Sequence, residues 1–503
     1  MSLKQNIISN YVSQIYVTLV SILMLPLYIK YMGAEAYGLI GFFMMLQAFF
    51  VLLDLGLTPT IGRETARYHG GGMPSLEYRQ LYRALSLIFF AVAILGGGGL
   101  YFLSDVVVHR WLNVESLPLH EVTLAVKIMA VCIAMRWMTG LYRGVITGSE
   151  RLVWLSGFNA VVATLRFILV LPVMWFYGFT PFVFFTYQLA VALVEIIGLG
   201  LQSQKLLSST KIPGEIVGWS FEPIKPILKF ALSIAFTSSV WVLVTQTDKL
   251  VLSGILPLEE YGYFTLAVLV ASGIMVISGP ISSAIMPRMA RLHAEGKSDE
   301  LIQIYRSSTQ IVSVIAGSAA ITLACCAKPL LFAWTGDPLL ATNAAPILQL
   351  YAIGNGLLAV AAFPYYLQYA KGNLRYHLIG NACMVIVLIP CIIWAARNYG
   401  GIGAAWVWLA MNAIYLLTWV GYVHHKLEPS LHKPWFIDDV LKIILPASVV
   451  ALGGISFEIN LDSRIANLLY VTFVGGLAMV CALGCAKSSR TLFLKQFTRR
   501  FKP

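Results

Sequence analysis

Long apolar segments alternate with short polar ones along the whole chain. Each apolar segment holds about 20 residues, enough for a helix to cross a hydrocarbon core about 30 Å thick. The pattern predicts fourteen such helices, at residues 7–29, 37–61, 84–104, 122–147, 153–177, 182–202, 228–254, 261–285, 307–333, 344–370, 377–396, 402–423, 441–457 and 464–486. The sequence therefore predicts an all-α polytopic membrane protein.

Composition and charge agree with this pattern. Of the 503 residues, 58% are hydrophobic and 12% are charged, against about 25% charged in soluble domains. One set of alternate loops carries 26 of the 35 Lys and Arg residues, whereas the opposite loops carry four. By the positive-inside rule, both termini are expected in the cytoplasm. The net charge of +12 is then topological, and we expect no nucleic-acid partner.

A repeat links two parts of the chain. Shifted by 224 residues, segment 35–69 falls on segment 259–293 with seven identities and no gap. Six predicted helices separate the copies, an even number, so both copies keep the same orientation. This predicts two six-helix lobes in parallel repeat, with a site between them near mid-membrane. The expected domains are 1–205 (N-lobe), 206–426 (C-lobe) and 427–503 (two extra helices and a basic cytoplasmic tail).

Two segments carry a resemblance to a known family. These are "YGLIGFFMMLQAFFVLLDLGLTPTIGRETARY", after the first predicted helix, and "TDKLVLSGILPLEEYGYF", in and after the seventh. With the helix count and the lobes, the chain resembles the polysaccharide flippases of the multidrug/oligosaccharidyl-lipid/polysaccharide exporter superfamily, whose members include O-antigen flippases. The resemblance covers essentially the whole chain, but its local motifs are diffuse.

The resemblance implies a function. It implies alternating-access export of a polyprenyl-pyrophosphate-linked glycan across a bacterial inner membrane, with a proton or Na⁺ as coupling ion. Expected partners are this lipid-linked glycan, membrane lipids and other polysaccharide assembly proteins, and no cofactor is expected. A peptidoglycan-precursor flippase and a drug exporter of the same superfamily remain open, as does a multispan O-antigen polymerase. We found no Walker A loop, nucleophile constellation or metal-ligand cluster, so no catalytic residue or metal site is predicted.

Ionisable residues within the predicted spans are candidates for the site, because a charge in hydrocarbon is costly unless it faces water or a partner. Arg136 and Arg166 lie near the middle of their spans, and Arg143 lies seven residues beyond Arg136 on the same face. A guanidinium matches phosphate oxygens bidentately. We therefore expect these arginines, with Lys249, to line a cationic lumen. For Arg143, snorkelling to the cytoplasmic surface is the alternative.

Polar residues repeat at the same spacing in other predicted spans. Examples are Asn159 with Arg166, Gln188 with Glu195, and Gln47 with Asp54. Small polar residues also hold membrane helices together without any lumen, which is the plainer interpretation. The acids Glu195 and Asp54 either pair with arginines or carry the coupling ion.

Three further positions complete the candidates. Asp248 and Lys249 are neighbours near the outer end of their span. Adjacent helical residues point about 100° apart, so each is expected to seek a partner elsewhere or to reach water. Asp248 is then either a gate or coupling residue or one half of a snorkelled interfacial pair. Arg67 and Arg291, matched across the repeat, are expected at the cytoplasmic rim, although the positive-inside rule alone also explains them.

Overall fold

A computed structural model describes residues 3–207, 218–455 and 463–486. Within these residues every regular element is a helix, which confirms the predicted all-α fold. The chain packs as two units, Met1–Gly262 and Tyr263–Pro503, and each is described here by itself.

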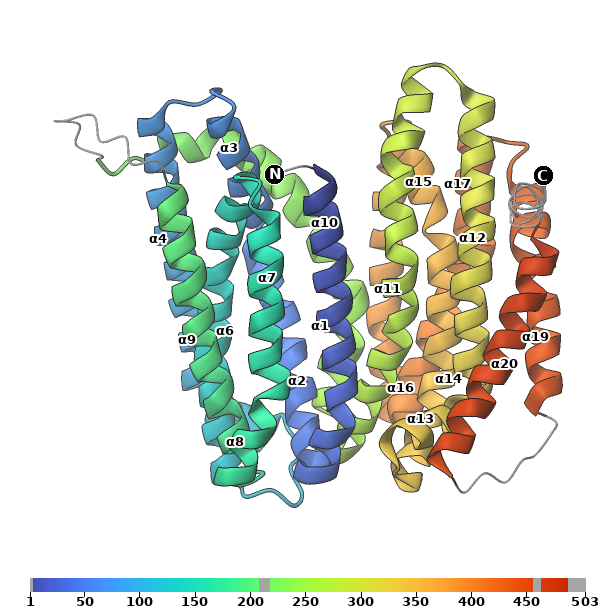
Figure 1. The fold of residues 1–503 in the computed structure, drawn as a ribbon, viewed down its shortest axis with the longest axis horizontal. Helices are drawn as coiled ribbons and strands as arrows, with labels where there is room; N and C mark the ends of the chain where they lie inside the picture. The colour runs from blue at the N-terminus through green and yellow to red at the C-terminus, as the bar shows by residue number, and fades with distance from the viewer. Residues whose placement is uncertain (1–2, 208–217, 456–462, 487–503) are drawn as a thin grey trace, which may run out of the picture. The chain divides into compact units, whose positions relative to one another are not determined.

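The first unit runs from blue to green in Figure 1. Its described helices are α1 (Leu3–Met32), α2 (Ala34–Phe50), η1 (Val51–Asp54), α3 (Leu57–His69), α4 (Ser75–Phe102), α5 (Ser104–Arg110), α6 (Leu119–Gly148), α7 (Leu152–Ala163), η2 (Thr164–Ile168), α8 (Val170–Tyr177), α9 (Pro181–Leu206), η3 (Glu222–Ile224) and α10 (Lys225–Ser253). The element η2 is a single π-helical turn, so α7, η2 and α8 form one interrupted helix.

The second unit begins within α11 (Leu258–Ala294). Its other described helices are α12 (Ser298–Cys325), α13 (Ala327–Thr335), α14 (Pro338–Ala361), α15 (Phe363–Ala370), α16 (Arg375–Ile414), η4 (Tyr415–Trp419), α17 (Val420–Leu427), α18 (His432–Pro434), η5 (Trp435–Leu441), α19 (Lys442–Ile455) and α20 (Arg464–Cys485). The helices α19 and α20 pack on each other and on α12.

Eleven helical segments of the described chain are long and apolar enough to cross a membrane. Two predicted helices, at 377–396 and 402–423, lie within one of these segments, Arg375–Leu427, which bends where Gly400 adopts a φ of 60°. The helices α10 and α19 are not among the eleven. The number fourteen is therefore not confirmed and stays a prediction.

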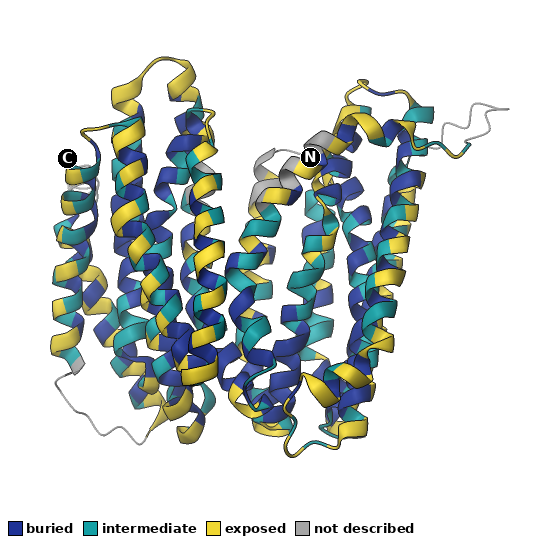
Figure 2. Cartoon of the chain, turned by 180° about the vertical axis from the view of Figure 1, so that it is seen from behind, coloured by how far each residue is buried: buried dark blue, intermediate teal, exposed yellow. Residues whose placement is uncertain are grey.

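Apolar side chains are exposed along the outer faces of the helices. Figure 2 shows exposed residues running lengthwise along helices whose other faces are buried. On α4, for example, Phe90, Ile94 and Leu95 are exposed. Hydrocarbon covers such faces at no cost, because lipid tails are as apolar as the side chains.

The predicted helix at 37–61 is interrupted. The backbone turns at Leu55 and Gly56, where φ is 45° and 70°. Asp54 stabilises the new helix start, because its carboxylate accepts from the Thr58 N–H at 3.2 Å and from the Thr58 hydroxyl at 2.6 Å. A side chain at Gly56 would also collide, since its Cβ would lie 2.3 Å from the Ala231 carbonyl oxygen of α10. The prediction of one continuous helix is wrong here.

A loop near residues 111–117 fastens the end of α10 to the rest of the first unit. The Glu35 carboxylate, at the start of α2, accepts hydrogen bonds from the backbone and hydroxyl of Ser116. The Asn113 side chain donates to the Ile255 carbonyl at 3.1 Å, and the Leu258 N–H donates to the Asn113 carbonyl at 2.9 Å. These bonds hold the turn between α10 and α11 against α2.

Glycines allow α3 and α6 to pack closely. A Cβ added to Gly148 would lie 2.2 Å from the carbonyl oxygen of Gly62, and one added to Gly144 would lie 2.4 Å from Cγ2 of Ile61. Small residues at such crossings let two helix backbones approach. This crossing lies on one side of α6, and the polar interior described below involves other residues of the same helix.

We expect Gly148→Ala to destabilise the protein by about 1–3 kcal/mol, because the added methyl group overlaps the backbone of α3. The measurement is thermal unfolding of the purified protein in detergent. Gly99→Ala is the matched control on α4, where nothing lies within 4 Å of the new Cβ. There the higher helix propensity of alanine should stabilise by at most about 1 kcal/mol. Equal effects of the two substitutions would contradict the packing argument.

Candidate functional site

A polar cavity of about 330 Å³ lies inside the first unit. It is lined by residues of α1, α6, α7, η2 and α9: Asn10, Ser13, Gln14, Val17, Thr18, Arg143, Asn159, Val162, Ala163, Arg166, Phe167 and Glu195. Two of the predicted lumen arginines and one predicted acid therefore meet at one cavity.

A buried ion pair forms one wall of the cavity. Nη2 of Arg143 lies 2.7 Å from Oε1 of Glu195, and Nη1 of Arg143 donates to the Asn159 side chain at 2.8 Å. Glu195 is 3% exposed, so its charge depends on this partner. Its second oxygen, Oε2, is buried and makes no hydrogen bond within the described residues. Of the two alternatives for Glu195, the structure places it in a pair, and its coupling role stays a prediction.

A second set of contacts between α6 and α9 lies seven residues away, at Arg136. Nη1 of Arg136 donates to Gln47 at 3.0 Å, and Nη2 donates to Gln188 at 2.9 Å. Its guanidinium also lies 5.2 Å from the centre of the Phe43 ring. Both glutamine side chains are neutral, so these two contacts hold Nη1 and Nη2 without cancelling the charge of Arg136, and its buried Nε has no hydrogen-bond partner within the described residues.

The third arginine sits on the π-helical turn η2. Three successive backbone carbonyls of this turn accept hydrogen bonds from side chains. The Leu165 carbonyl accepts from the Tyr187 hydroxyl at 3.0 Å, and the Arg166 carbonyl accepts from the Gln188 amide at 2.9 Å. The Phe167 carbonyl accepts from the Tyr28 hydroxyl at 2.6 Å. A π-turn disturbs the regular helical bonding and is frequent at functional sites. Pro172 lies four residues after Ile168 and has no backbone N–H, so it cannot donate a helical hydrogen bond to the Ile168 carbonyl.

Arg166 itself is the least satisfied of the three. Within the described residues its guanidinium donates no hydrogen bond to another side chain, and its Nε is buried without a partner. Glu195 lies within electrostatic reach of Arg166, Arg143 and Arg136. Three guanidinium groups thus share one carboxylate, and the interior carries a net positive charge. Such a site suits an anion with several oxygens, such as a phosphate.

The described residues contain no group of His, Cys, Asp and Glu side chains that could hold a metal ion.

Asp248 and Lys249 lie apart from this cavity and bind each other. Nζ of Lys249 lies 3.1 Å from Oδ1 of Asp248 and donates to the Thr245 carbonyl at 2.6 Å. The expectation that these neighbours cannot face one another is wrong, because the four-carbon stem of lysine curls back over one turn. Asp248 is 1% exposed, and its carboxylate is held in this pair. Its gate role and the substrate contact of Lys249 stay predictions.

The remaining candidates lie outside the cavity. Asp54 is bound by Thr58, as described above, rather than by an arginine of the described chain. Arg67 lies 3.4 Å from Glu64, and Arg291 lies 3.1 Å from Glu295, each within one helical turn. Both arginine side chains are mostly exposed. Their place at a cytoplasmic rim stays a prediction.

Sequence reasoning missed the aromatic and hydroxyl groups that support the arginines. Phe43 and Phe167 lie beneath guanidinium groups, and Tyr28 and Tyr187 hold the π-turn. In a chain with 12% aromatic residues, these positions carry no distinguishing pattern. The sequence signal for this region was the seven-residue spacing of Asn159 and Arg166.

A buried ion pair in the second unit was also missed. Nε of Arg306 in α12 lies 2.6 Å from Oδ2 of Asp439 in η5, and Gln310 donates to the same carboxylate at 2.7 Å. Asp439 is fully buried. The pair fastens the segment before α19 to α12, which is a structural role.

Breaking the pair in the first unit should destabilise the protein. We expect Glu195→Gln and Arg143→Gln each to lower the unfolding temperature in detergent, because each leaves a charge without its partner. The double variant should lose less than the sum of the two, with a coupling free energy of about 0.5–3 kcal/mol. Strict additivity would show that the two side chains do not interact in the folded protein.

The chain is similar in sequence to a known protein family and to individual bacterial proteins. Residues 3–293 match the sequence profile of the family described as "Polysaccharide biosynthesis protein". The chain is 20% identical over 428 residues to a Shigella flexneri protein described as "Putative O-antigen transporter", covering 84% of this chain and 98% of the relative. It is 21% identical over 507 aligned positions to the Bacillus subtilis protein "Uncharacterized membrane protein EpsK", with 95% of each covered.

Two solved structures are similar in fold. "Lipid II flippase MurJ, inward closed conformation" has a TM-score of 0.71 at 15% identity, covering 98% of this chain and 99% of that chain. An inward-facing multidrug resistance transporter of the MATE family, in the MOP superfamily, has a TM-score of 0.65 at 11% identity, covering 82% and 96%. At these identities the likeness shows the fold. With the apolar helical segments, these findings support a multi-pass membrane protein.

Proposed function

The chain belongs to the polysaccharide biosynthesis protein family of exporters and flippases, as the resemblance in its sequence predicted, and from this premise we propose that it carries a lipid-linked oligosaccharide across a bacterial inner membrane. The cargo is a glycan on polyprenyl pyrophosphate, such as an O-antigen repeat unit, moved from the cytoplasmic to the outer face by alternating access. Both termini are cytoplasmic in this proposal, in line with the distribution of Lys and Arg.

The observation that carries the proposal is the net positive cavity of the first unit. Arg166 has a buried Nε with no hydrogen-bond partner in the described chain, and it faces a cavity of about 330 Å³. Pyrophosphate supplies several charged oxygens that such a group binds strongly in a low-dielectric interior. Arg143 and Arg136, already held by their partners, add positive potential without having to reorganise.

The charge of the same cavity also bears on the other substrates that proteins of this fold carry. A peptidoglycan precursor also carries pyrophosphate on a polyprenyl chain, so it remains the second candidate, supported by the likeness to the lipid II flippase. An organic cation in this cavity would meet the guanidinium groups of Arg143 and Arg166 and a carboxylate already paired with Arg143, which opposes its binding. We therefore place drug export below both lipid-linked cargoes, and a multispan polymerase below all three.

We expect Arg166→Gln to lower transport by about 10- to 100-fold, because it removes charge-assisted hydrogen bonds to phosphate. The measurement is movement of a labelled lipid-linked glycan into the lumen of inverted membrane vesicles. Arg110→Gln is the matched control, because Arg110 is an exposed arginine of α5 away from the cavity. Full transport by folded Arg166→Gln protein would refute the anion site.

The same vesicles test ion coupling. The buried Oε2 of Glu195 has no hydrogen-bond partner in the described chain and is the acceptor that we assign to a proton or Na⁺. We expect transport to respond to an imposed gradient of one of these ions, and Glu195→Gln to remove that response. A gradient response that survives this substitution would move the coupling site elsewhere, with Asp54 and Asp248 as the next candidates.

A further inference from the structure

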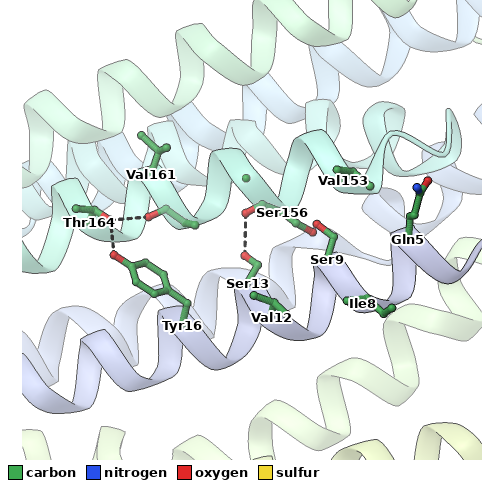
Figure 3. A pocket seen from close by; sticks show the side chains of 12 residues that line it. Gln5, Ile8, Ser9, Val12, Ser13, Tyr16, Val153, Ser156, Val161 and Thr164 are labelled. Atoms are coloured by element: carbon green, nitrogen blue, oxygen red, sulfur yellow. Dashed lines mark hydrogen bonds between the residues drawn. The ribbon is translucent and has the colours of Figure 1, made fainter. Parts of the chain in front are cut away.

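A second cavity, of about 750 Å³, lies in the groove between α1 and α7. Figure 3 shows the two helices side by side, with Ser13 and Tyr16 reaching from α1 toward α7. The groove is lined by Gln5, Ile8, Ser9, Val12, Ser13, Tyr16, Val153, Ser156, Gly157, Ala160, Val161 and Thr164. Small residues on both helices leave the space that forms the groove.

The groove and the cationic cavity lie on neighbouring faces of α1. The groove uses one face of α1, with Ile8 and Val12, whereas the cationic cavity uses another, with Asn10 and Gln14. Ser13 lines both. The groove and the arginine cavity therefore meet at Ser13, where α1 contacts α7.

Few polar contacts close the seam between α1 and α7. The Ser13 hydroxyl donates to the Ser156 carbonyl at 2.8 Å, and the Tyr16 hydroxyl lies 2.7 Å from the hydroxyl of Thr164. Thr164 is also the first residue of the π-helical turn that carries Arg166. A ligand bound to Arg166 therefore acts on the same turn that closes the seam.

The outer side of the groove is apolar and exposed. Val12 is 62% exposed and Val161 is 57% exposed. In a multi-pass membrane protein such a face lies against hydrocarbon rather than water. The groove thus joins a hydrocarbon environment to a cationic cavity across one seam.

We propose that the α1–α7 groove seats the hydrocarbon chain of the lipid-linked substrate while its phosphate groups occupy the cavity at Arg166. The proposal rests on the proposed function, and it adds the place where the chain leaves the protein. The occupant is a long apolar chain attached to an anion, because the apolar groove lies beside a cavity in which the buried Nε of Arg166 has no hydrogen-bond partner in the described chain. A pocket of this volume lies within the range of about 300–1,000 Å³ typical of small-ligand sites.

The first test fills the groove. Gly157 lines the groove and has no atom within 4 Å of a new Cβ, so Gly157→Trp adds an indole to the groove with no collision at Cβ. We expect it to lower transport of the lipid-linked glycan by at least about tenfold, because the chain loses its apolar contacts. Gly99→Trp on α4, where the new Cβ is equally unopposed, is the matched control and should transport normally.

A second measurement separates this proposal from the proposed function. Binding of inorganic pyrophosphate to the purified protein depends on the arginines and not on the groove. Gly157→Trp should keep this binding, whereas Arg166→Gln should lose it. If Gly157→Trp transports normally, the groove proposal is overturned and the proposed function stands. If Arg166→Gln keeps both binding and transport, the proposed function fails.

Photo-crosslinking covers the case in which Gly157→Trp fails to fold. A photoreactive amino acid is placed at Val12, in the groove, or at Leu23, an equally exposed position of α1 outside it. With labelled polyprenyl-pyrophosphate glycan, labelling should be stronger at Val12, and excess unlabelled substrate should suppress it. Equal labelling at the two positions would overturn the proposal.

Discussion

The ion pair between Arg143 and Glu195 is the interaction on which the polar interior of the first unit depends. Glu195 is the carboxylate that all three arginines of this region share. Paired, it keeps Arg143 in place and leaves the surplus positive charge at Arg136 and Arg166. Without it, three partly buried guanidinium groups would lie in this region without this carboxylate, and neutral hydrogen bonds do not offset the desolvation of an unpaired charge. Glu195 is thus placed so that it neutralises only part of the positive charge of this region.

The π-helical turn is the second constraint, because it sets the position of Arg166. A regular helix through Thr164–Ile168 would satisfy its own carbonyls and would leave Tyr28, Tyr187 and Gln188 without these acceptors. The three side chains reach the turn from α1 and α9. They replace helical bonding with tertiary bonding, so the stability of the turn depends on how these neighbouring helices are placed. Tyr28 of α1 and Arg166 are therefore connected through the backbone of this turn.

Spacing along the sequence foretold part of this site. Arg136 and Arg143 are seven residues apart, as are Gln188 and Glu195, and the structure pairs them rung by rung between α6 and α9. A seven-residue period needs only a straight helix, so sequence alone reveals it. The π-turn and the break at residues 55–56 depend on tertiary partners and leave no periodic trace. The Asp248–Lys249 contact depends on side-chain length, which an argument from backbone angles ignores.

The predicted repeat and the packing units divide the chain at different places, and one contact explains why. Under the offset of 224 residues, Ala34 corresponds to Leu258 and Gly38 to Gly262. A Cβ on Gly38 would meet the Leu258 carbonyl oxygen at 2.1 Å, and one on Gly262 would meet that of Ala34 at 2.7 Å. Such a reciprocal contact is what a two-fold relation between two copies produces. This contact packs the start of segment 259–293 against the start of segment 35–69. Residues up to Gly262 therefore belong to the first packing unit. The lobes divided at residue 205 stay a prediction from the repeat, whereas the packing units divide at Gly262.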